Sequence, residues 1–376
     1  MTEKRIKPRV CHLTTVHDPL DDRIFHKECK SLEEAGYETT IIAPHPKDKM
    51  VDGIRIVGLR KAKKRWSRIF LLPPQVFCKA IREKADIYHF HDPELIPVGI
   101  ALRLFLNKKV VYDVHEDYSK QVLSKPYLPG ASRKTLAVII RALENLSSII
   151  FSGIVTATDD IRNNFSHHKK AVSVKNYPVM SYFQDEKNNT QVRKEFRVVY
   201  VGGVSKTRGI VEAIQALEYI EKPIKLIICG DFNLYDEGLR LYQFKGIHKV
   251  ESLGWISHES IGQVLKTCDA GLVCLHPLPN YLTALPVKLF EYLAAGLPVI
   301  ASDFPVLKII VDGNRCGLCV NPLDPRAIAA AMEYLMDHPE ERAEMGLNGM
   351  HAVEKGYNWN AERQKLLDLY KGILKR

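Results

Sequence analysis

The segment PVKLFEYLAAGLPVIAS, residues 286–302, carries a short helix and two charged side chains from which the rest of the chain can be interpreted. After Pro286, apolar residues recur at helical spacing and give the helix one apolar face, formed by Leu289, Phe290, Leu293 and Ala294. The helix is predicted to begin near Lys288 and to end before Gly296 and Pro298.

The start of this helix is a candidate anion site. Backbone N–H groups at a helix start lack helical partners and carry partial positive charge, and Lys288 adds a full charge beside them. Phosphate suits such a site best. Glu291 follows at i,i+3, where a carboxylate can accept paired hydrogen bonds from ribose hydroxyls. An ordinary amphipathic helix with a surface salt bridge explains the same two residues.

The length of 376 residues suggests two domains, and the 46% hydrophobic and 26% charged fractions are typical of a soluble globular protein. No segment has the roughly 18 uncharged apolar residues of a spanning helix, and the start lacks the apolar core of a signal peptide, so we expect a cytoplasmic protein. The eight Cys are scattered, which favours reduced buried thiols. The pair Cys316 and Cys319 lacks a second pair for zinc, so strand packing is expected there.

Positive charge is concentrated in the first half. Residues 1–184 contain 31 Lys and Arg against 20 Asp and Glu, a net charge of +11, whereas residues 185–376 contain 23 against 24. No helix-turn-helix, RNP-like or zinc-finger pattern occurs, so nucleic acid is not an expected partner. From Arg60 to Leu72, basic residues pass into aromatic and aliphatic ones, a composition suited to anionic lipid headgroups; a solvated loop leading into a core helix explains it equally well.

Strand, loop and helix alternate through the first half, which predicts a parallel sheet with helices on both faces. Candidate strands lie at 10–15, 39–43, 54–57, 87–91, 110–113, 153–157 and 172–174. Polar clusters follow three of them, at 17–23, 91–94 and 113–117, where ligands bind in such sheets. Asx turns and helix caps explain any one cluster, but three together favour a binding site.

The second half repeats this alternation after a linker expected at Gln184 to Gln191. The first loop combines glycines, which let the backbone approach a ligand, with cations that can neutralise phosphate. It matches neither the Walker A nor the GxGxxG pattern. Further polar or aromatic loop residues follow, among which Trp255 is equally well explained as a core residue.

Segment 286–302 resembles the nucleotide-sugar signature of the GT4-like retaining glycosyltransferases, and the similarity covers nearly the whole chain. The resemblance implies the GT-B fold, an α/β architecture with two Rossmann-like doubly wound domains facing across a cleft. The expected domains are residues 1–184, to which a last helix at about 358–376 returns, and residues 185–357. The chain departs from the family pattern at Thr283, where the first Glu of an E-x7-E motif is common, and at Gly203, where Arg is usual.

The resemblance also implies roles for individual residues. The implied catalytic residues are His115, whose loop approaches donor sugar and acceptor, and Lys288 and Arg208, which hold the donor diphosphate; Glu291 is implied to hold the ribose. The remaining donor-side residues are Gly202, Gly203, Lys206, Gly230, Trp255, Ile256, Asn280, Tyr281, Pro286, Val287 and Leu289. The acceptor-side residues are Arg23, Asp92 and Glu116, and Arg23 and Asp92 are alternatively expected to shape their loops.

We therefore expect a retaining hexosyl- or N-acetylhexosaminyl-type transferase that uses a nucleotide diphosphate sugar, with UDP favoured. Its expected acceptor is a glycan or lipid-linked molecule in cell-surface polysaccharide or glycoconjugate synthesis. No metal or cofactor is expected, because Lys288, Arg208 and helix N–H groups can stabilise the leaving diphosphate. A nucleotide-sugar epimerase and a noncatalytic GT-B subunit are the alternatives. Residues 60–72 are expected to attach the protein peripherally to the inner face of the plasma membrane.

Overall fold

The computed structural model describes residues 7–62, 64–123, 130–183, 194–232 and 240–375, apart from side chains at positions 65, 130, 131, 258 and 259. The expected linker at 184–191 lies outside the described residues. The chain divides into two compact units. Unit 1 comprises Met1–Asn176 and Asn360–Arg376, and unit 2 comprises Tyr177–Trp359.

Unit 1 is built on an eight-stranded sheet with the order β3-β4-β2-β1-β5-β6-β7-β8. Its strands are β1 (Arg9–Leu13), β2 (Glu38–Pro44), β3 (Lys49–Val51), β4 (Ile54–Leu59), β5 (Ile87–Phe90), β6 (Lys109–Val114), β7 (Gly153–Thr156) and β8 (Ala171–Ser173). Neighbouring strands are parallel, which confirms the prediction, except that β3 runs antiparallel to β4. The sequence pattern does not predict β3, because three residues are too few to show a period.

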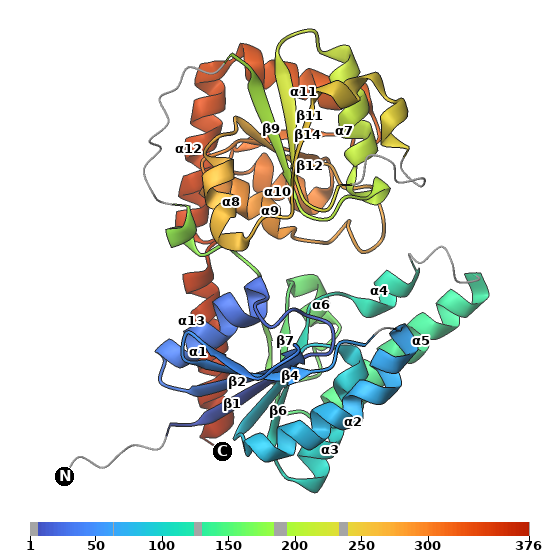
Figure 1. Ribbon diagram of the computed structural model, residues 1–376, viewed down its shortest axis with the longest axis vertical. Coiled ribbons are helices and arrows are strands. Elements are labelled where there is room, and N and C mark those ends of the chain that lie inside the picture. Colours follow the sequence, from blue (N-terminus) through green and yellow to red (C-terminus); the bar gives the residue numbers. More distant parts are fainter. Residues whose placement is uncertain (1–6, 63, 124–129, 184–193, 233–239, 376) are drawn as a thin grey trace, which may run out of the picture. The chain divides into compact units, whose positions relative to one another are not determined.

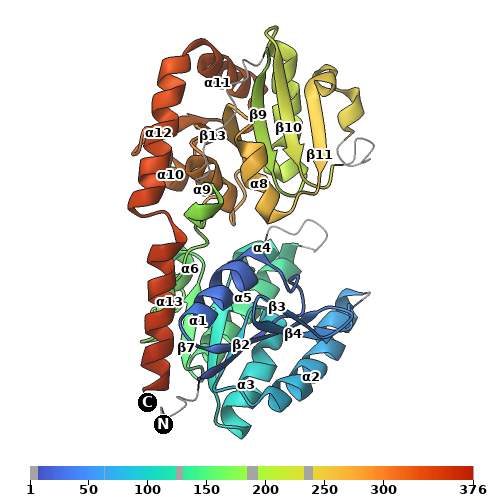
Figure 2. The same cartoon turned by 60° about the vertical axis from the view of Figure 1, so that its left-hand side comes forward.

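Helices cover both faces of this sheet. Figure 1 and Figure 2 show α2, α3 and α5 on one side of it and α1 and α13 on the other. The helices are η1, a π-helix (Asp22–Cys29), α1 (Lys30–Glu34), α2 (Arg65–Glu83), α3 (Ile96–Phe105), α4 (Tyr118–Leu123), α5 (Gly130–Ser148), α6 (Asp159–Asn163) and α13 (Trp359–Leu374). Although α13 ends the chain, its Tyr370 hydroxyl lies 2.7 Å from Nδ1 of His89 on β5, within hydrogen-bond distance.

Alternating residues of β1, β5 and β6 face different helical layers, because successive strand side chains point to opposite faces. Leu13, Phe90 and Tyr112 share an apolar core with Val76 of α2 and Leu102 of α3. The positions between them carry polar side chains that are also buried, namely His12, His89, His91 and Asp113. The face of the sheet opposite to this apolar core is therefore buried but polar at its centre.

Unit 2 has a six-stranded, fully parallel sheet with the order β11-β10-β9-β12-β13-β14. Its strands are β9 (Phe196–Val201), β10 (Ile224–Cys229), β11 (Val250–Gly254), β12 (Ala270–Val273), β13 (Val299–Ser302) and β14 (Gly317–Val320). Its helices are α7 (Ile210–Ala216), α8 (His258–Leu265), α9 (Val287–Ala294), α10 (Pro305–Val311), α11 (Pro325–Asp337) and α12 (Pro339–Lys355). Separate apolar cores cover the two faces, as expected for a doubly wound domain.

Two details concern the edges of unit 2. The chain enters the core of unit 2 at Tyr177, and the centroid of the Tyr177 ring lies 4.6 Å from that of the Phe290 ring. Residues 177–183 therefore pack on unit 2, although the sequence places them in the first domain. Cys316 and Cys319 contribute to the same core beside β14, in agreement with the expected strand packing.

Candidate active site

Helix α9 begins at Val287, one residue before the predicted start, and Pro286 is its N-cap residue. Proline has no side-chain acceptor, so the first backbone N–H groups of the helix are not capped by it. The side chain of Leu289 is fully buried in the core, and its N–H donates to the Pro286 carbonyl at 3.0 Å. Val287 and Lys288 are therefore the backbone donors that the helix start can offer to a ligand.

The ammonium group of Lys288 lies buried at this helix start. Its Nζ has no hydrogen-bond partner among the described residues, and it lies 3.7 Å from the ring centroid of Tyr200 at the end of β9. Burial, and after it the charge of Arg208, lower the pKa of Lys288 to about 7. A buried cation without an ionic partner is unfavourable, so this position is prepared to receive an anion.

The glycine-rich loop after β9 brings Arg208 to the same place. A Cβ atom on Gly202 would lie 3.2 Å from Lys288 Nζ, and one on Gly203 would lie 2.8 Å from Arg208 Nη1. Gly202 also has a φ of +122°, which strains any other residue. Arg208 Nη1 donates to the Gly203 carbonyl at 3.1 Å. The two cations therefore converge on a loop whose conformation at Gly202 requires glycine.

Two further donor-side residues lie close to this loop. A Cβ atom on Gly230, at the end of β10, would lie 2.1 Å from the Gly202 carbonyl oxygen, so glycine is required where the two loops touch. Glu291 lies one turn into α9 and is only 5% exposed. The structure thus brings Gly202, Gly230, Arg208 and Lys288 together, as the sequence predicts.

The remaining donor-side residues are spread over loops of unit 2. Trp255 is 80% exposed, so the alternative that it belongs to the core is wrong, whereas Ile256 packs partly against the core. Tyr281 also packs against that core, Asn280 is half-buried, and Lys206 is exposed. The proposed contacts of these residues with a nucleotide sugar remain predictions.

Unit 1 carries a second polar site at the carboxyl ends of β1, β5 and β6. Arg23 of η1 lies in its centre and pairs with Asp113 through two hydrogen bonds, each 3.0 Å long. Arg23 Nε also lies 3.1 Å from Glu28 Oε1. Although burial opposes ionisation, Arg23 and then His115 hold the pKa of Asp113 well below its usual range. Asp113 is therefore a carboxylate.

This carboxylate orients His115. His115 Nε2 lies 3.1 Å from Asp113 Oδ2, and because a carboxylate can only accept, Nε2 carries the proton of the neutral ring. Nδ1 of His115 is then left as a hydrogen-bond acceptor. The side chain is 14% exposed, so the imidazole is held from inside the unit while remaining accessible to solvent.

A chain of imidazoles continues inward from His115. His91 Nδ1 lies 3.0 Å from His115 Nε2, and His91 Nε2 lies 3.0 Å from His12 Nδ1. The His12 and His91 rings are 15° from parallel, which suits a direct hydrogen bond between them. Burial lowers the pKa of His91 to about 4. Burial also lowers the pKa of His12, so the two inner imidazoles, His12 and His91, are uncharged at neutral pH.

Burial favours loop shaping over acceptor contact for two of the acceptor-side residues. Arg23 and Asp92 are 3% and 2% exposed, because Arg23 is enclosed by carboxylates and Asp92 accepts hydrogen bonds from Thr14 Oγ1 and the Thr15 N–H. Both shape the site from inside and do not offer a surface to an acceptor. Glu116 is exposed and accepts a hydrogen bond from Gln121 Nε2. Of the three residues, only Glu116 is therefore accessible to an acceptor.

Two groups of side chains in unit 1 place metal-ligand atoms within 4.8 Å of one another, namely His12, Glu28, His89 and His91, and His91, Asp113 and His115. Several of these atoms already bond each other, and the Arg23 guanidinium lies against both carboxylates. Burial, and then the Asp113 charge, raise the pKa of Glu28 well above its usual value. The guanidinium thus already supplies positive charge to the carboxylates that a metal ion would need as ligands.

Sequence reasoning missed His12, His89 and Tyr200. For the first two, the sequence does contain a signal. Polar residues occur two positions apart at three neighbouring strands, which places them on the same face of the sheet: His12 and Thr14, His89 and His91, and Asp113 and His115. Tyr200 gives no such signal, because its role depends on the position of Lys288 from a distant segment.

Comparisons with known proteins agree with this arrangement. Residues 22–174 match the family model of glycosyltransferase family 4, and residues 182–351 match that of the glycosyl transferases group 1. An uncharacterized glycosyltransferase of Methanocaldococcus jannaschii is 24% identical over 315 residues, covering 77% of this chain and 76% of that protein. A D-rhamnosyltransferase of Pseudomonas aeruginosa is 23% identical over 343 residues, with coverage of 87% and 85%.

Solved structures share the fold. Sucrose-phosphate synthase from Thermosynechococcus elongatus superimposes with a TM-score of 0.79 at 17% identity, covering 98% of this chain and 100% of that one. HepE of Anabaena, in complex with UDP-glucose, gives a TM-score of 0.72 at 14% identity, with coverage of 97% and 99%.

Proposed function

Because this chain belongs to the GT4-like glycosyltransferases, which have the GT-B fold, we propose that it transfers a hexosyl- or N-acetylhexosaminyl-type sugar from a nucleotide diphosphate donor with retention of configuration. The proposed acceptor is a glycan or a lipid-linked molecule in cell-surface polysaccharide or glycoconjugate synthesis.

The unpartnered ammonium of Lys288 is the observation that carries this proposal. Sugar transfer builds negative charge on the diphosphate that leaves, and fixed donors aimed at that charge lower the barrier. Lys288, Arg208 and the first N–H groups of α9 are such donors, and the two side chains lie against Gly202 and Gly203, which have no side chains. The positive charge of these groups supports a reaction that needs no metal, and metal independence is part of the proposal.

The favoured nucleotide is UDP. HepE has been solved with UDP-glucose and with UDP, and starch synthase IV of Arabidopsis thaliana with ADP, so more than one base occurs among proteins of this fold. Glu291 is proposed to bind the ribose, because a carboxylate accepts paired hydrogen bonds from two neighbouring hydroxyls. Trp255 is proposed to lie at the nucleobase, since its exposed ring offers a stacking surface.

His115 is the proposed unit 1 residue that contacts the sugars. Its Nδ1, left free by the bond from Nε2 to Asp113, can accept a hydrogen bond from a sugar hydroxyl. Glu116 beside it is exposed and is proposed to contact the acceptor.

Peripheral attachment to an anionic membrane on the cytoplasmic side is also proposed, through residues 60–72. Trp66 and Phe70 on the first turns of α2 are 57% and 71% exposed, and Lys61 and Lys64 precede them with exposed side chains. Lys63 and the side chain of Arg65 lie outside the described residues. Within the described parts of the chain, we find no helix with the length and apolarity needed to cross a bilayer.

Release of nucleoside diphosphate from candidate sugar donors tests the main proposal. The transferase should release it at a rate that rises with added acceptor, and the product should keep the anomeric configuration of the donor. A nucleotide-sugar epimerase would interconvert donors without this acceptor dependence, and a noncatalytic subunit would release nothing. Either result, obtained with a protein that binds nucleotide, would reject the proposed activity.

A further inference from the structure

Helix α5 buries its polar side and exposes its apolar side. Glu144, Ser147 and Ser148 are at most 3% exposed, although they are polar. The large apolar side chains of the same segment face solvent instead: Val138 at 69%, Ile139 at 48%, Leu143 at 54%, Leu146 at 66% and, just past the helix, Ile149 at 69%. A helix on a soluble domain normally has the opposite arrangement.

Hydrogen bonds explain why the inner side of α5 tolerates polar residues. The Tyr112 hydroxyl of β6 donates to Glu144 Oε1 at 3.0 Å. Ser147 and Ser148 donate to carbonyls within α5, at 3.1 and 2.7 Å. Only the Tyr112 bond joins α5 to the sheet, whereas the two serine bonds satisfy the buried hydroxyls within the helix.

The exposed apolar surface continues onto the end of α3. Leu104 and Phe105 are 61% and 81% exposed there, and Arg103 beside them lines the same pocket as Ile149. Helices α2, α3 and α5 form one layer and together contribute 12 of the 26 exposed large apolar side chains of the described residues. We call Leu104, Phe105 and the five apolar side chains from Val138 to Ile149 the α5 surface. Isolated apolar side chains need no explanation, but a concentration of this kind marks a contact surface.

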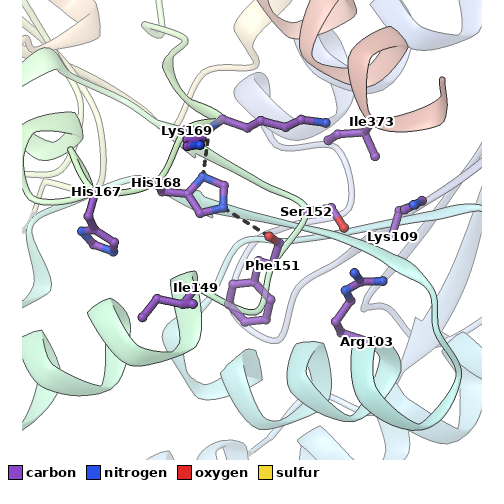
Figure 3. Close-up of a pocket in the computed structure, with 10 residues that line it drawn as sticks. Arg103, Lys109, Ile149, Phe151, Ser152, His167, His168, Lys169 and Ile373 are labelled. Atoms are coloured by element: carbon purple, nitrogen blue, oxygen red, sulfur yellow. Dashed lines mark hydrogen bonds between the residues drawn. The ribbon is translucent and has the colours of Figure 1, made fainter. Parts of the chain in front are cut away.

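A basic pocket lies at the end of the α5 surface. Figure 3 shows it, and its lining includes Arg103, Lys109, His168, Lys169 and Lys170 together with Ile149. Its volume is about 360 Å³. His168 is fixed in the wall, because its Nε2 lies 3.2 Å from the Phe151 carbonyl and its Nδ1 accepts from the Lys170 N–H. Among the described residues, no carboxylate forms an ion pair with Lys109 or Lys169.

We propose that the α5 surface lies in the interface of an anionic lipid bilayer, with the basic pocket holding a lipid phosphate headgroup. The apolar side chains would enter the boundary between headgroups and acyl chains, as an interfacial helix does, while the lysines remain among the phosphates. A second copy of the chain fits less well, because two such surfaces would bring like charges together. The proposal rests on the membrane association proposed above and adds a surface separate from residues 60–72.

Vesicle sedimentation tests this surface. The full chain should pellet with vesicles of phosphatidylcholine and phosphatidylglycerol and not with phosphatidylcholine alone. Leu143→Ser combined with Leu146→Ser should weaken the binding by about tenfold or more, because two exposed side chains no longer enter the bilayer. Lys109→Gln combined with Lys169→Gln should weaken it at low salt and have little effect at high salt, where charges are screened.

Matched controls keep the test specific. Ile309→Ser combined with Leu347→Ser removes two exposed apolar side chains, 72% and 52% exposed, from helices of unit 2, and should leave vesicle binding unchanged. All variants should keep the thermal unfolding temperature of the parent protein. Soluble phosphate at the lipid phosphate concentration should not compete with anionic vesicles, because it offers no apolar phase.

The proposal would be overturned if the parent protein ignored anionic vesicles. It would also be overturned if Leu143→Ser with Leu146→Ser bound vesicles like the parent, or if Lys109→Gln with Lys169→Gln had no effect at low salt. A loss produced by Lys61→Ser with Lys64→Ser but not by the α5 pair would assign the membrane contact to residues 60–72 alone. Dimers in solution that the α5 pair dissociates would assign the surface to a second copy. Nucleotide binding is measured separately, so a failure of sugar transfer would leave the vesicle result standing.

Discussion

At the scale of single residues, the proton on Lys288 links nucleotide binding to pH. Its pKa is lowered to about 7 in the free protein, chiefly by burial, and a bound diphosphate would raise it. Affinity should therefore be greatest below about pH 7, where Lys288 is already charged, and should fall by up to about tenfold per pH unit above it.

Calorimetry measures this directly. At about pH 8, UDP binding should take up a proton, so the observed enthalpy should depend on the ionisation enthalpy of the buffer. Lys288→Met should abolish the uptake. An unchanged buffer dependence in that variant would show that another group takes the proton.

The charges around the diphosphate should differ from Glu291 in what they recognise. Lys288→Ala and Arg208→Ala should each weaken UDP and pyrophosphate alike, by about 1–3 kcal/mol, because charge-assisted hydrogen bonds are lost. Glu291→Ala should weaken UDP and affect pyrophosphate less, since its proposed partner is the ribose. Titration calorimetry with both ligands separates these roles, and equal losses in the Glu291 variant would contradict ribose binding.

His115 should matter for turnover more than for nucleotide binding. His115→Ala should lower transfer by about 100-fold or more and leave UDP affinity within about twofold, because its proposed contact is with the sugars. In the parent protein, nitrogen NMR should find the His115 proton on Nε2, as its bond to Asp113 requires. A fully active alanine variant would remove the catalytic role, and a proton on Nδ1 alone would reject the orientation by Asp113.

At the scale of elements, α5 makes the stability of unit 1 depend on pH. Burial raises the pKa of Glu144 from 4.5 to about 7, so the folded state binds a proton that the unfolded state has released between those values. This stabilisation is complete below about pH 4.5 and is lost as the pH rises through 7. Glu144→Gln should therefore match the parent at low pH and be more stable at about pH 8, by at most roughly 3 kcal/mol.

Denaturant unfolding at both pH values tests this, with Glu354→Gln on the exposed side of α12 as the control. The glutamine at 144 can still accept the Tyr112 hydrogen bond, so the change isolates the charge. If the difference in unfolding free energy between the parent and Glu144→Gln is the same at both pH values, Glu144 does not titrate in this range.

At the scale of the whole molecule, nucleotide binding should be confined to unit 2. Hydrogen exchange with UDP should slow at the loop after β9 and at the first turn of α9, because those backbone groups are proposed to bind the diphosphate. The strands of unit 1 should exchange unchanged. Protection found only in unit 1 would reject the donor assignment.

The sequence by itself determined the parallel character of both sheets, apart from the antiparallel β3, and the start of α9 within one residue. The family resemblance implied the grouping of Lys288, Arg208 and Gly202, which the structure brings together. These features can be predicted from the sequence because the periods of helices and strands are local, and because ligand-binding residues follow strand ends in parallel sheets. The resemblance to a family contributed the roles of Lys288 and Glu291, since phosphate chemistry and an ordinary surface salt bridge explained the same pattern.

Only the tertiary structure decided which polar residues are inside. Arg23 and Asp92 follow strand ends as exposed binding residues do, yet both are buried, because β1, β5 and β6 bring distant carboxylates and hydroxyls around them. The same holds for Tyr200 beneath Lys288 and for the outward apolar side of α5. A local period shows that a helix or strand has two sides, but which side is covered depends on partners supplied by remote segments of the chain.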